Sequence, residues 1–328
     1  MKRIFSGMQP TGQLHLGNYF GALKNWVQLQ DSYECFYGIV DLHALTTAYD
    51  SSDTVADAVI AVAADWLSAG LDPEKSVLFI QSHVQEHAEL HLILSMITPI
   101  PWLERVPTYK EKQQELAGKD LSTYGFLGYP VLQTADIILY KAEVVPVGED
   151  QVPHIELARE VTRRFNNYYG NIFPEPQTLL SSSPKLRGTD GRKMSKSYGN
   201  SIFMAEDPAE LDRKVRKMMT DPRRKRRSDP GGPEDCPVFD LHKVFTEPEK
   251  REEVAHLCRT AGWGCLDCKQ VLLDRMHPVM DPMKRRRDEL LMHPDRILAV
   301  LHQGADRARR VARQTMEQVR AAIGLLKA

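Results

Sequence analysis

Two short runs of residues carry side chains suited to holding a nucleotide triphosphate. The first is residues 15–18, His-Leu-Gly-Asn, and the second is residues 193–197, Lys-Met-Ser-Lys-Ser. The first run joins an imidazole, a residue without a Cβ and an amide, and the second sets two ammonium groups around a small hydroxyl. Such groups bind phosphates and stabilise the charge that develops when a phosphate bond is split. Either run alone recurs by chance, but the pair predicts a nucleotide triphosphate site.

The elements around these runs must bring both of them to one ligand. Residues 3–6 predict a short strand ending at Gly7, and apolar side chains at helical spacing predict a helix over residues 17–30. The first run then lies where a strand feeds a helix, so N–H groups face a phosphate and Gly17 allows close approach. Glycines flank the second run, which suits a mobile loop that closes over pyrophosphate. A helix-capping asparagine beside a surface histidine, and a solvated basic turn, would be the plainer interpretations.

Strand and helix signals alternate through the first part of the chain. Buried strands are predicted at residues 35–40, 77–81 and 144–147. Helices are predicted from Ser51 or Ser52 to Gly70 and at residues 86–98 and 155–165. This order predicts a doubly wound (Rossmann-like) α/β domain with a parallel sheet, which binds ligands beyond the carboxyl ends of its strands.

After residue 193 the pattern changes to helices alone. Helical spacing occurs at residues 209–219, 236–244, 250–260, 269–287 and 295–326. We therefore expect two domains, a nucleotide-binding domain over residues 1–200 and a smaller all-helical domain over residues 201–328. We also expect the last helix to pack back on the first domain.

Composition and charge are those of a globular protein that stays in the cytoplasm. Apolar residues make up 42% of the 328 residues and charged residues 27%, with no apolar run near the ~20 residues that span a bilayer. The start of the chain is too short and mixed for a secretion signal, so no membrane partner is expected. Residues 1–200 hold 17 Lys/Arg and 23 Asp/Glu, whereas residues 201–328 hold 26 and 21. The basic last third indicates an anionic partner, unless it reflects scattered solvated charges.

The two runs match the paired signature motifs of class I aminoacyl-tRNA synthetases, and the chain resembles the bacterial tryptophanyl-tRNA synthetase family over essentially its whole length. The opening Phe-Ser-Gly-Met-Gln-Pro-Thr-Gly at residues 5–12 is similar to that family's pattern. So are Val-Asp-Leu-His-Ala at 40–44, Pro-Val-Gly-Glu-Asp-Gln at 146–151 and His-Ile-Glu-Leu at 154–157.

This resemblance implies a reaction in which an amino acid and ATP give an aminoacyl-adenylate and pyrophosphate, followed by transfer to tRNA(Trp). No enzyme nucleophile is needed, because the substrate carboxylate attacks phosphorus and the protein positions it and stabilises charge. Mg²⁺ should accompany the phosphates, and the family implies a homodimer. The implied catalytic residues are His15, Asn18, Lys193 and Lys196. The implied ATP contacts are Gln9, Pro10, Thr11, Gly17, Asn18, Lys112, Gly148, Asp150, Lys193, Met194, Ser195 and Lys196.

The amino-acid pocket is implied around Asp136, in the segment 129–137. A carboxylate in an apolar wall can accept the indole N–H of tryptophan, and it would accept a phenol O–H equally well. Gln133 is also familiar from tyrosine enzymes, so tyrosyl-tRNA synthetase remains the alternative. The implied substrate contacts are Phe5, Gly7, His43, Tyr129, Gln133, Asp136, Ile137, Val145, Val147 and Gln151.

Four of the five cysteines fall late in the chain, at Cys236, Cys258, Cys265 and Cys268. The last two form a C-x₂-C pair, which can bring two thiolates to one metal. Because disulfides are rare in the cytosol, metal binding is favoured over free thiols. Spacing leaves Zn²⁺ and a [4Fe–4S] cluster open. A subset of the family carries a [4Fe–4S] cluster on such a pattern beside the anticodon-binding region. This resemblance implies that residues 201–328 form an anticodon-binding domain with the four-cysteine site, and it favours iron–sulfur in a structural role.

The densest basic run follows Pro222 and is an implied tRNA contact: Arg223, Arg224, Lys225, Arg226 and Arg227. A second basic run occupies residues 284–287. Such runs supply affinity for phosphates rather than base specificity.

Two further classes of protein could share the paired nucleotide motifs. One is an adenylate-forming enzyme that does not charge tRNA, and the predicted helical domain at the end of the chain argues against it. The second is a tRNA-binding paralogue without catalytic activity. Because a paralogue of that kind has no need of His15, Asn18, Lys193 and Lys196, their presence favours an active synthetase.

Overall fold

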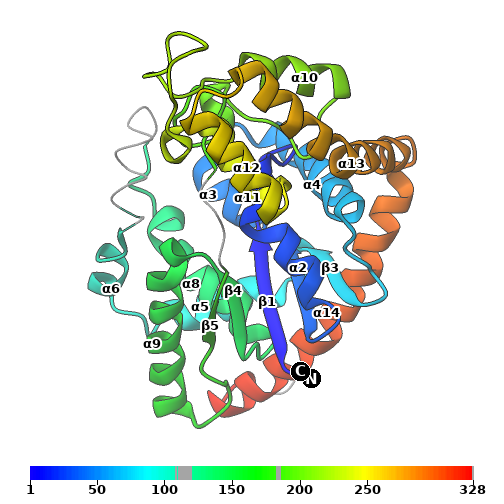
Figure 1. The fold of residues 1–328 in the computed structure, drawn as a ribbon. Helices are drawn as coiled ribbons and strands as arrows, with labels where there is room; N and C mark the ends of the chain where they lie inside the picture. Colours follow the sequence, from blue (N-terminus) through cyan, green and yellow to red (C-terminus); the bar gives the residue numbers. More distant parts are fainter. Residues whose placement is uncertain (108, 110–119, 182–185, 327–328) are drawn as a thin grey trace.

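The centre of the molecule is a five-stranded parallel sheet with the strand order β3-β2-β1-β4-β5 (Figure 1). The computed structural model describes residues 1–107, 109, 120–181 and 186–326. The strands are β1 (Arg3–Met8), β2 (Glu34–Ile39), β3 (Ser76–Ile80), β4 (Val144–Val147) and β5 (Gln177–Leu180). Because β2 and β4 flank β1 on opposite sides, the winding reverses at β1, and such a switch point leaves a ligand crevice beyond the carboxyl ends of the strands. The predicted doubly wound α/β fold is confirmed.

Helices cover both faces of the sheet. The helices of the described residues, including those beyond the sheet, are α1 (Leu16–Asn18), α2 (Lys24–Leu29), α3 (Asp41–Ala48), α4 (Val55–Ala69), α5 (Glu86–Ser95), α6 (Ile100–Glu104), α8 (Tyr124–Leu139), α9 (Val152–Tyr169), α10 (Pro208–Lys217), α11 (Pro237–Phe245), α12 (Pro248–Arg259), α13 (Cys265–Leu291) and α14 (Pro294–Ala322). The helix predicted over residues 17–30 is interrupted by a π-helical turn, Tyr19–Leu23. Elements α3, α6, α8 and β5 are additional to those predicted from sequence.

Successive strand residues point to opposite faces and enter two separate cores. Ile4 and Tyr37 belong to the core that α2 and α4 cover, whereas Phe5 and Phe36 belong to the core under α5, α8, α9 and α14. Burial on both faces explains why these strands are almost continuously apolar.

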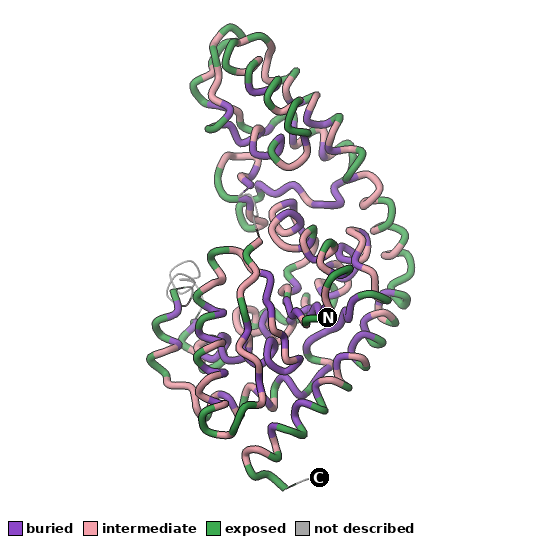
Figure 2. The backbone as a smooth tube through the Cα atoms, turned by 60° about the horizontal axis from the view of Figure 1, so that its bottom comes forward, coloured by how far each residue is buried: buried purple, intermediate pink, exposed green. Residues whose placement is uncertain are grey.

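Helices α10 to α13 form the region beyond the sheet, and α14 runs back alongside it (Figure 2). Helix α14 packs on β3 so closely that a Cβ on Gly304 would lie 1.8 Å from the carbonyl oxygen of Leu78. Helix α13 packs on α4 and therefore connects the helical region to the part of the chain that contains the sheet. Among the described residues, no helix is both long and apolar enough to cross a membrane.

Candidate active site

The His15 run lies beyond the carboxyl end of β1, where the chain enters α1. His15 is the N-cap of α1: the Asn18 N–H donates to His15 Nδ1 at 3.3 Å, and the His15 N–H donates to Asn18 Oδ1 at 3.1 Å. Burial, followed by the nearby charge of Lys196, lowers the pKa of His15 to about 4. At neutral pH the ring is therefore uncharged, and with Nδ1 accepting a hydrogen bond its Nε2–H is left as a donor.

A glycine at position 17 leaves the space that the His15 ring occupies. A Cβ at this position would lie 2.8 Å from His15 Cε1, so a side chain here would displace the ring. This steric requirement is local and exists before any nucleotide binds. It adds to the predicted role of Gly17 in close approach of the backbone to a phosphate.

Lys196 brings the second run onto the loop that precedes the first. Its Nζ donates to the carbonyl oxygens of Thr11 at 2.9 Å and Gly12 at 3.1 Å, and to Thr11 Oγ1 at 3.2 Å. Burial lowers the pKa of this lysine, and the carboxylate of Asp65 opposes that effect. The two runs, far apart in sequence, therefore share one site, while the side chain of Lys193 is exposed.

Backbone hydrogen bonds hold the segment after the lysines beside the His15 run. The Leu16 N–H donates to the Ile202 carbonyl at 2.9 Å, and the Met204 N–H donates to the Leu14 carbonyl at 2.9 Å. Met194, buried at 4% exposure, anchors the lysine loop in the core. The segment that follows the lysine loop is therefore fixed against the two neighbours of His15 in the chain.

Asn200 organises the lysine loop, and the sequence analysis does not identify it. Its Oδ1 accepts the Ser195 N–H at 2.8 Å, and its Nδ2 donates to the Lys193 carbonyl at 3.1 Å and to Asp190 Oδ1 at 2.7 Å. The signal that the sequence does offer is the Gly-Asn pair that follows the run.

Asp136, on α8, lies at the carboxyl ends of the strands and is 1% exposed. Its Oδ2 is hydrogen bonded to His43 Nε2 at 2.9 Å, and its Oδ1 accepts from Gln81 Nε2 at 2.7 Å. His87 Nδ1 lies 2.7 Å from Oδ1, at ion-pair distance. Burial by itself raises the pKa of Asp136, but the charge of His87 and the hydrogen bonds and charge of His43 outweigh it, and the pKa falls to about 2. The group is a permanent carboxylate at neutral pH.

Gln81 and His87 are functional candidates that sequence analysis misses. Gln81 immediately follows β3, so its position at the carboxyl end of a strand is the signal that could have identified it. His87 is fully buried in α5, and its Nε2 is 2.7 Å from the Tyr140 hydroxyl. Tyr140 in turn stacks on Phe5, with ring centroids 5.7 Å apart. Asp136 is thereby connected to the apolar core beneath it.

The remaining predicted substrate contacts are spread over β1, β4 and α8. Gly7 faces Val40, whose Cγ1 would lie 2.8 Å from an added Cβ. Val145 is buried and Val147 partly buried at the end of β4. Tyr129 is buried with its hydroxyl 3.4 Å from His154 Nε2. Gln133 is partly buried and Ile137 fully buried, both on α8.

The turn after β4 holds further predicted nucleotide contacts. The Gln151 side chain donates to Asp150 Oδ2 at 3.0 Å, and Gly148 leaves room for the Asp150 carboxylate. Gln9 and Pro10 belong to the loop after β1 that Lys196 meets. Lys112 lies outside the described residues.

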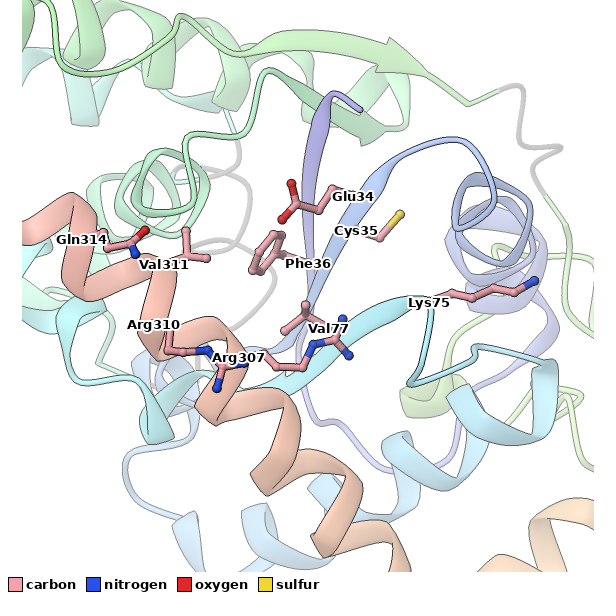
Figure 3. Close-up of a pocket in the computed structure, with 9 residues that line it drawn as sticks. All are labelled: Glu34, Cys35, Phe36, Lys75, Val77, Arg307, Arg310, Val311 and Gln314. Carbon is pink, nitrogen blue, oxygen red and sulfur yellow. The ribbon is translucent and has the colours of Figure 1, made fainter.

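A cavity of about 300 Å³ opens at the opposite end of the sheet (Figure 3). It is lined by Glu34, Cys35 and Phe36 at the start of β2, with Arg307 and Arg310 from α14. Because His15 and Asp136 lie at the carboxyl ends of the strands, this cavity is not part of their site.

The four late cysteines converge where α11, α12 and α13 meet. Burial, followed by the charges of the other three thiols, raises the pKa of Cys268 to about 12, and its Sγ is 3.4 Å from His242 Nε2. Cys35 is buried elsewhere, in β2. Within the part of the chain that the structure describes, no group of three or more His, Cys, Asp or Glu side chains is placed to hold a metal ion.

The basic run after Pro222 is partly neutralised within the protein. Arg223 pairs with Asp221 and Asp235, and Arg227 lies 3.6 Å from Asp267. Arg224 donates to the Trp263 and Arg227 carbonyls. The side chains of Lys225 and Arg226 are exposed, so these two cations of the run face solvent.

Comparison with known proteins gives the family of this fold and site. Residues 1–279 match the model of the tRNA synthetases class I (W and Y). The chain belongs to this class I tRNA synthetase family. It is 53% identical to the tryptophan–tRNA ligase of Thermotoga maritima over 326 residues, covering 99% of both chains. It is 45% identical to that of Deinococcus radiodurans over 333 residues, covering all of both.

A solved synthetase has the same overall structure. The tryptophanyl-tRNA synthetase of Campylobacter jejuni, complexed with ADP and tryptophan, superposes with a TM-score of 0.87 at 36% identity. The match covers 98% of this chain and all of the Campylobacter chain. The predicted class I synthetase family is therefore confirmed, and the similarity extends through the helical region.

Proposed function

We propose that this synthetase activates L-tryptophan with ATP to give tryptophanyl-adenylate and pyrophosphate, and then transfers tryptophan to tRNA(Trp). The observation that carries the choice of amino acid is the similarity to tryptophan–tRNA ligases over the full chain, and the ionised, buried Asp136 supplies an acceptor that fits the side chain of this substrate. Indole N–H is a donor only, and a carboxylate is an acceptor only, so the pair is complementary.

In the activation step the tryptophan carboxylate attacks the α-phosphorus of ATP and the bond to pyrophosphate breaks. The neutral His15, with Nδ1 occupied by Asn18, offers its Nε2–H to the α-phosphate as charge builds there. Lys196, released from Thr11 and Gly12, supplies a positive charge to the leaving pyrophosphate, with Lys193 beside it. Bound Mg²⁺ would neutralise phosphate charge.

The test is ATP–pyrophosphate exchange by the purified chain with tryptophan and tyrosine in parallel. We expect exchange with tryptophan alone. Exchange with tyrosine would reassign the enzyme to the tyrosyl alternative and make Gln133 the residue to examine. Exchange with neither amino acid would favour a tRNA-binding paralogue that charges nothing.

We further propose that the four late cysteines hold a [4Fe–4S] cluster, with Zn²⁺ as the alternative. The donor set fits such a group chemically, because Cys236, Cys258 and Cys265 lie near enough to help raise the pKa of Cys268, and a bound cation would favour the thiolates. The cysteines would be the ligands, and the group would hold the ends of α11 to α13 together. Electron transfer is not part of this proposal.

Metal analysis of the full-length chain, purified without oxygen, separates these possibilities. Iron and sulfide with visible absorption would support the cluster, and zinc without absorption would support the alternative. The double variant Cys265→Ser/Cys268→Ser should lose the metal, whereas the matched control Cys35→Ser should keep it. Neither metal in the unaltered protein would leave four free thiols.

We propose that residues 1–200 activate the amino acid and that residues 201–328, which carry the basic helical region, bind tRNA. We also propose that the protein is a homodimer in the cytoplasm. Lys225 and Arg226 are exposed, so Lys225→Glu/Arg226→Glu should weaken tRNA charging while sparing ATP–pyrophosphate exchange. Equal loss in both assays would overturn this role. The homodimer is proposed from the resemblance to the family, and sedimentation analysis can measure it.

A further inference from the structure

Asp65 is a buried carboxylate outside the amino-acid pocket. It lies on α4 and is 0% exposed. Burying a carboxylate is costly unless it is paired and hydrogen bonded. Its two oxygens do have partners, and these come from two different parts of the molecule.

One oxygen holds the backbone that leads into the ATP site. Asp65 Oδ2 accepts the Leu14 N–H at 2.6 Å, and Leu14 directly precedes His15. The Leu14 carbonyl accepts the Met204 N–H at 2.9 Å. The peptide groups of Leu14 are therefore tied on one side to α4 and on the other to the segment after the lysine loop.

The second oxygen faces the helical region. Arg287 Nε of α13 donates to Asp65 Oδ1 at 2.6 Å, and the arginine side chain is only 11% exposed. Arg287 belongs to the second basic run, but this ion pair takes it away from any tRNA contact. Removing one partner of a buried pair leaves an uncompensated charge, which is strongly destabilising.

Helix α13 carries this contact far from the sheet. It runs from Cys265 to Leu291, so its 27 residues span ~40 Å. Near its start, Lys269 Nζ donates to the carbonyls of Arg216 at 2.7 Å and Met218 at 2.6 Å. The helix is thus anchored in the cysteine region at one end and meets Asp65 near its opposite end.

We propose that Asp65 is a positioning residue for the ATP site, and that its ion pair with Arg287 ties the position of the His15 segment to helix α13. The inference rests on the proposed role of His15 in binding ATP. Loss of the ion pair loosens the Leu14 peptide and misplaces the imidazole. The pocket around Asp136 stays unchanged, because His43, Gln81 and His87 hold that carboxylate from different elements.

The test compares Arg287→Met, Asp65→Asn and the double variant with the control Arg286→Met, which removes an exposed arginine from the preceding position of α13. In ATP–pyrophosphate exchange we expect the KM for ATP to rise about tenfold in Arg287→Met, since a buried charge loses its partner. Asp65→Asn keeps an acceptor for the Leu14 N–H and should raise the KM for ATP about threefold. The double variant should match Asp65→Asn, and the KM for tryptophan should stay within about twofold throughout.

Hydrogen–deuterium exchange of the peptide that covers residues 13–18 gives a readout independent of catalysis. It should exchange faster in Arg287→Met than in Arg286→Met. An unchanged KM for ATP together with unchanged exchange would overturn the inference while leaving the proposed function intact. A different outcome would overturn the role of His15: faster hydrogen–deuterium exchange in Arg287→Met, together with normal ATP binding by a separate His15→Ala variant. If Arg287→Met fails to fold, the nearly isosteric Asp65→Asn carries both measurements.

Discussion

The proposed amino-acid pocket and the junction between α4 and α13 each bury one carboxylate, but the two environments shift the pKa of that carboxylate in opposite directions. Both Asp136 and Asp65 are essentially inaccessible to solvent. Burial raises the pKa of Asp65 and is not overcome by Arg287 and the Leu14 N–H, whereas the pKa of Asp136 falls to about 2 beside His87, His43 and Gln81. Burial alone therefore does not decide the charge of a carboxylate; the number and charge of its donors do.

This difference predicts separate kinetic roles, and Asp136→Asn should have the largest effect. An amide here would place N–H groups against the Gln81 and imidazole donors and lose the charge that they surround. We expect kcat/KM for tryptophan to fall about 1000-fold, which corresponds to about 4 kcal/mol. The measurement is ATP–pyrophosphate exchange at varied tryptophan, with Asp65→Asn as the matched control. Equal losses in both variants would remove the distinction between the two carboxylates.

Lys196→Met tests the side of the site that Asp65 supports. Lys196 interacts electrostatically with Asp65 and contacts Thr11 and Gly12. Loss of its charge should lower kcat for exchange about 100-fold, as for removal of one transition-state donor. The KM for tryptophan should stay within about twofold. The control is Lys75→Met, an exposed lysine paired with Asp31, and a comparable loss there would contradict the assignment.

Gln81→Leu tests whether the donors around Asp136 matter individually. It removes the 2.7 Å hydrogen bond to Oδ1 and the acceptor of the Leu42 N–H, while leaving the contacts of His43 and His87 with Asp136. We expect about a tenfold fall in kcat/KM for tryptophan, from one buried hydrogen bond to a charged group. Steady-state kinetics at saturating ATP measure it. No change would mean that the two imidazoles hold Asp136 without the amide.

As pH falls, the two carboxylates should change the free energy of unfolding in opposite directions. The pKa of Asp136 lies below its ordinary value of 3.8, so this group stabilises the fold above that value, by about 2 kcal/mol, and the contribution is lost as pH falls toward 2. The pKa of Asp65 is raised, so folding gains stability as pH falls through its folded pKa toward 3.8. Urea unfolding between pH 7 and 3 should show Asp136→Asn losing less stability than the unaltered chain, and Asp65→Asn losing more. If Asp136→Asn lost more stability than the unaltered chain and Asp65→Asn lost less, the directions of both pKa shifts would be contradicted.

The order of the elements and the positions of the strands were largely predictable, because the local spacing of apolar residues indicates them. Residues 144–147 form β4 as predicted, and the remaining predicted strands agree within a few residues. Helix α8 escapes such reasoning because Tyr124–Leu139 is buried on nearly all sides and contains Pro130, so it has neither an amphipathic stripe nor an uninterrupted helical composition. Strand β5 is short and partly exposed at the sheet edge.

The sequence by itself determined the chemistry available: the imidazole and amide of the first run, the two lysines, the carboxylate at position 136 and the late cysteines. Only the tertiary structure decided how these groups are used. It brought Lys196 onto Thr11, surrounded Asp136 with His43, Gln81 and His87, and drew Arg287 out of a basic run to meet Asp65. Arg287 and Asp65 are 222 residues apart in the chain, and Lys196 and Thr11 are 185 apart. Their approach depends on helices packed on a sheet rather than on local spacing.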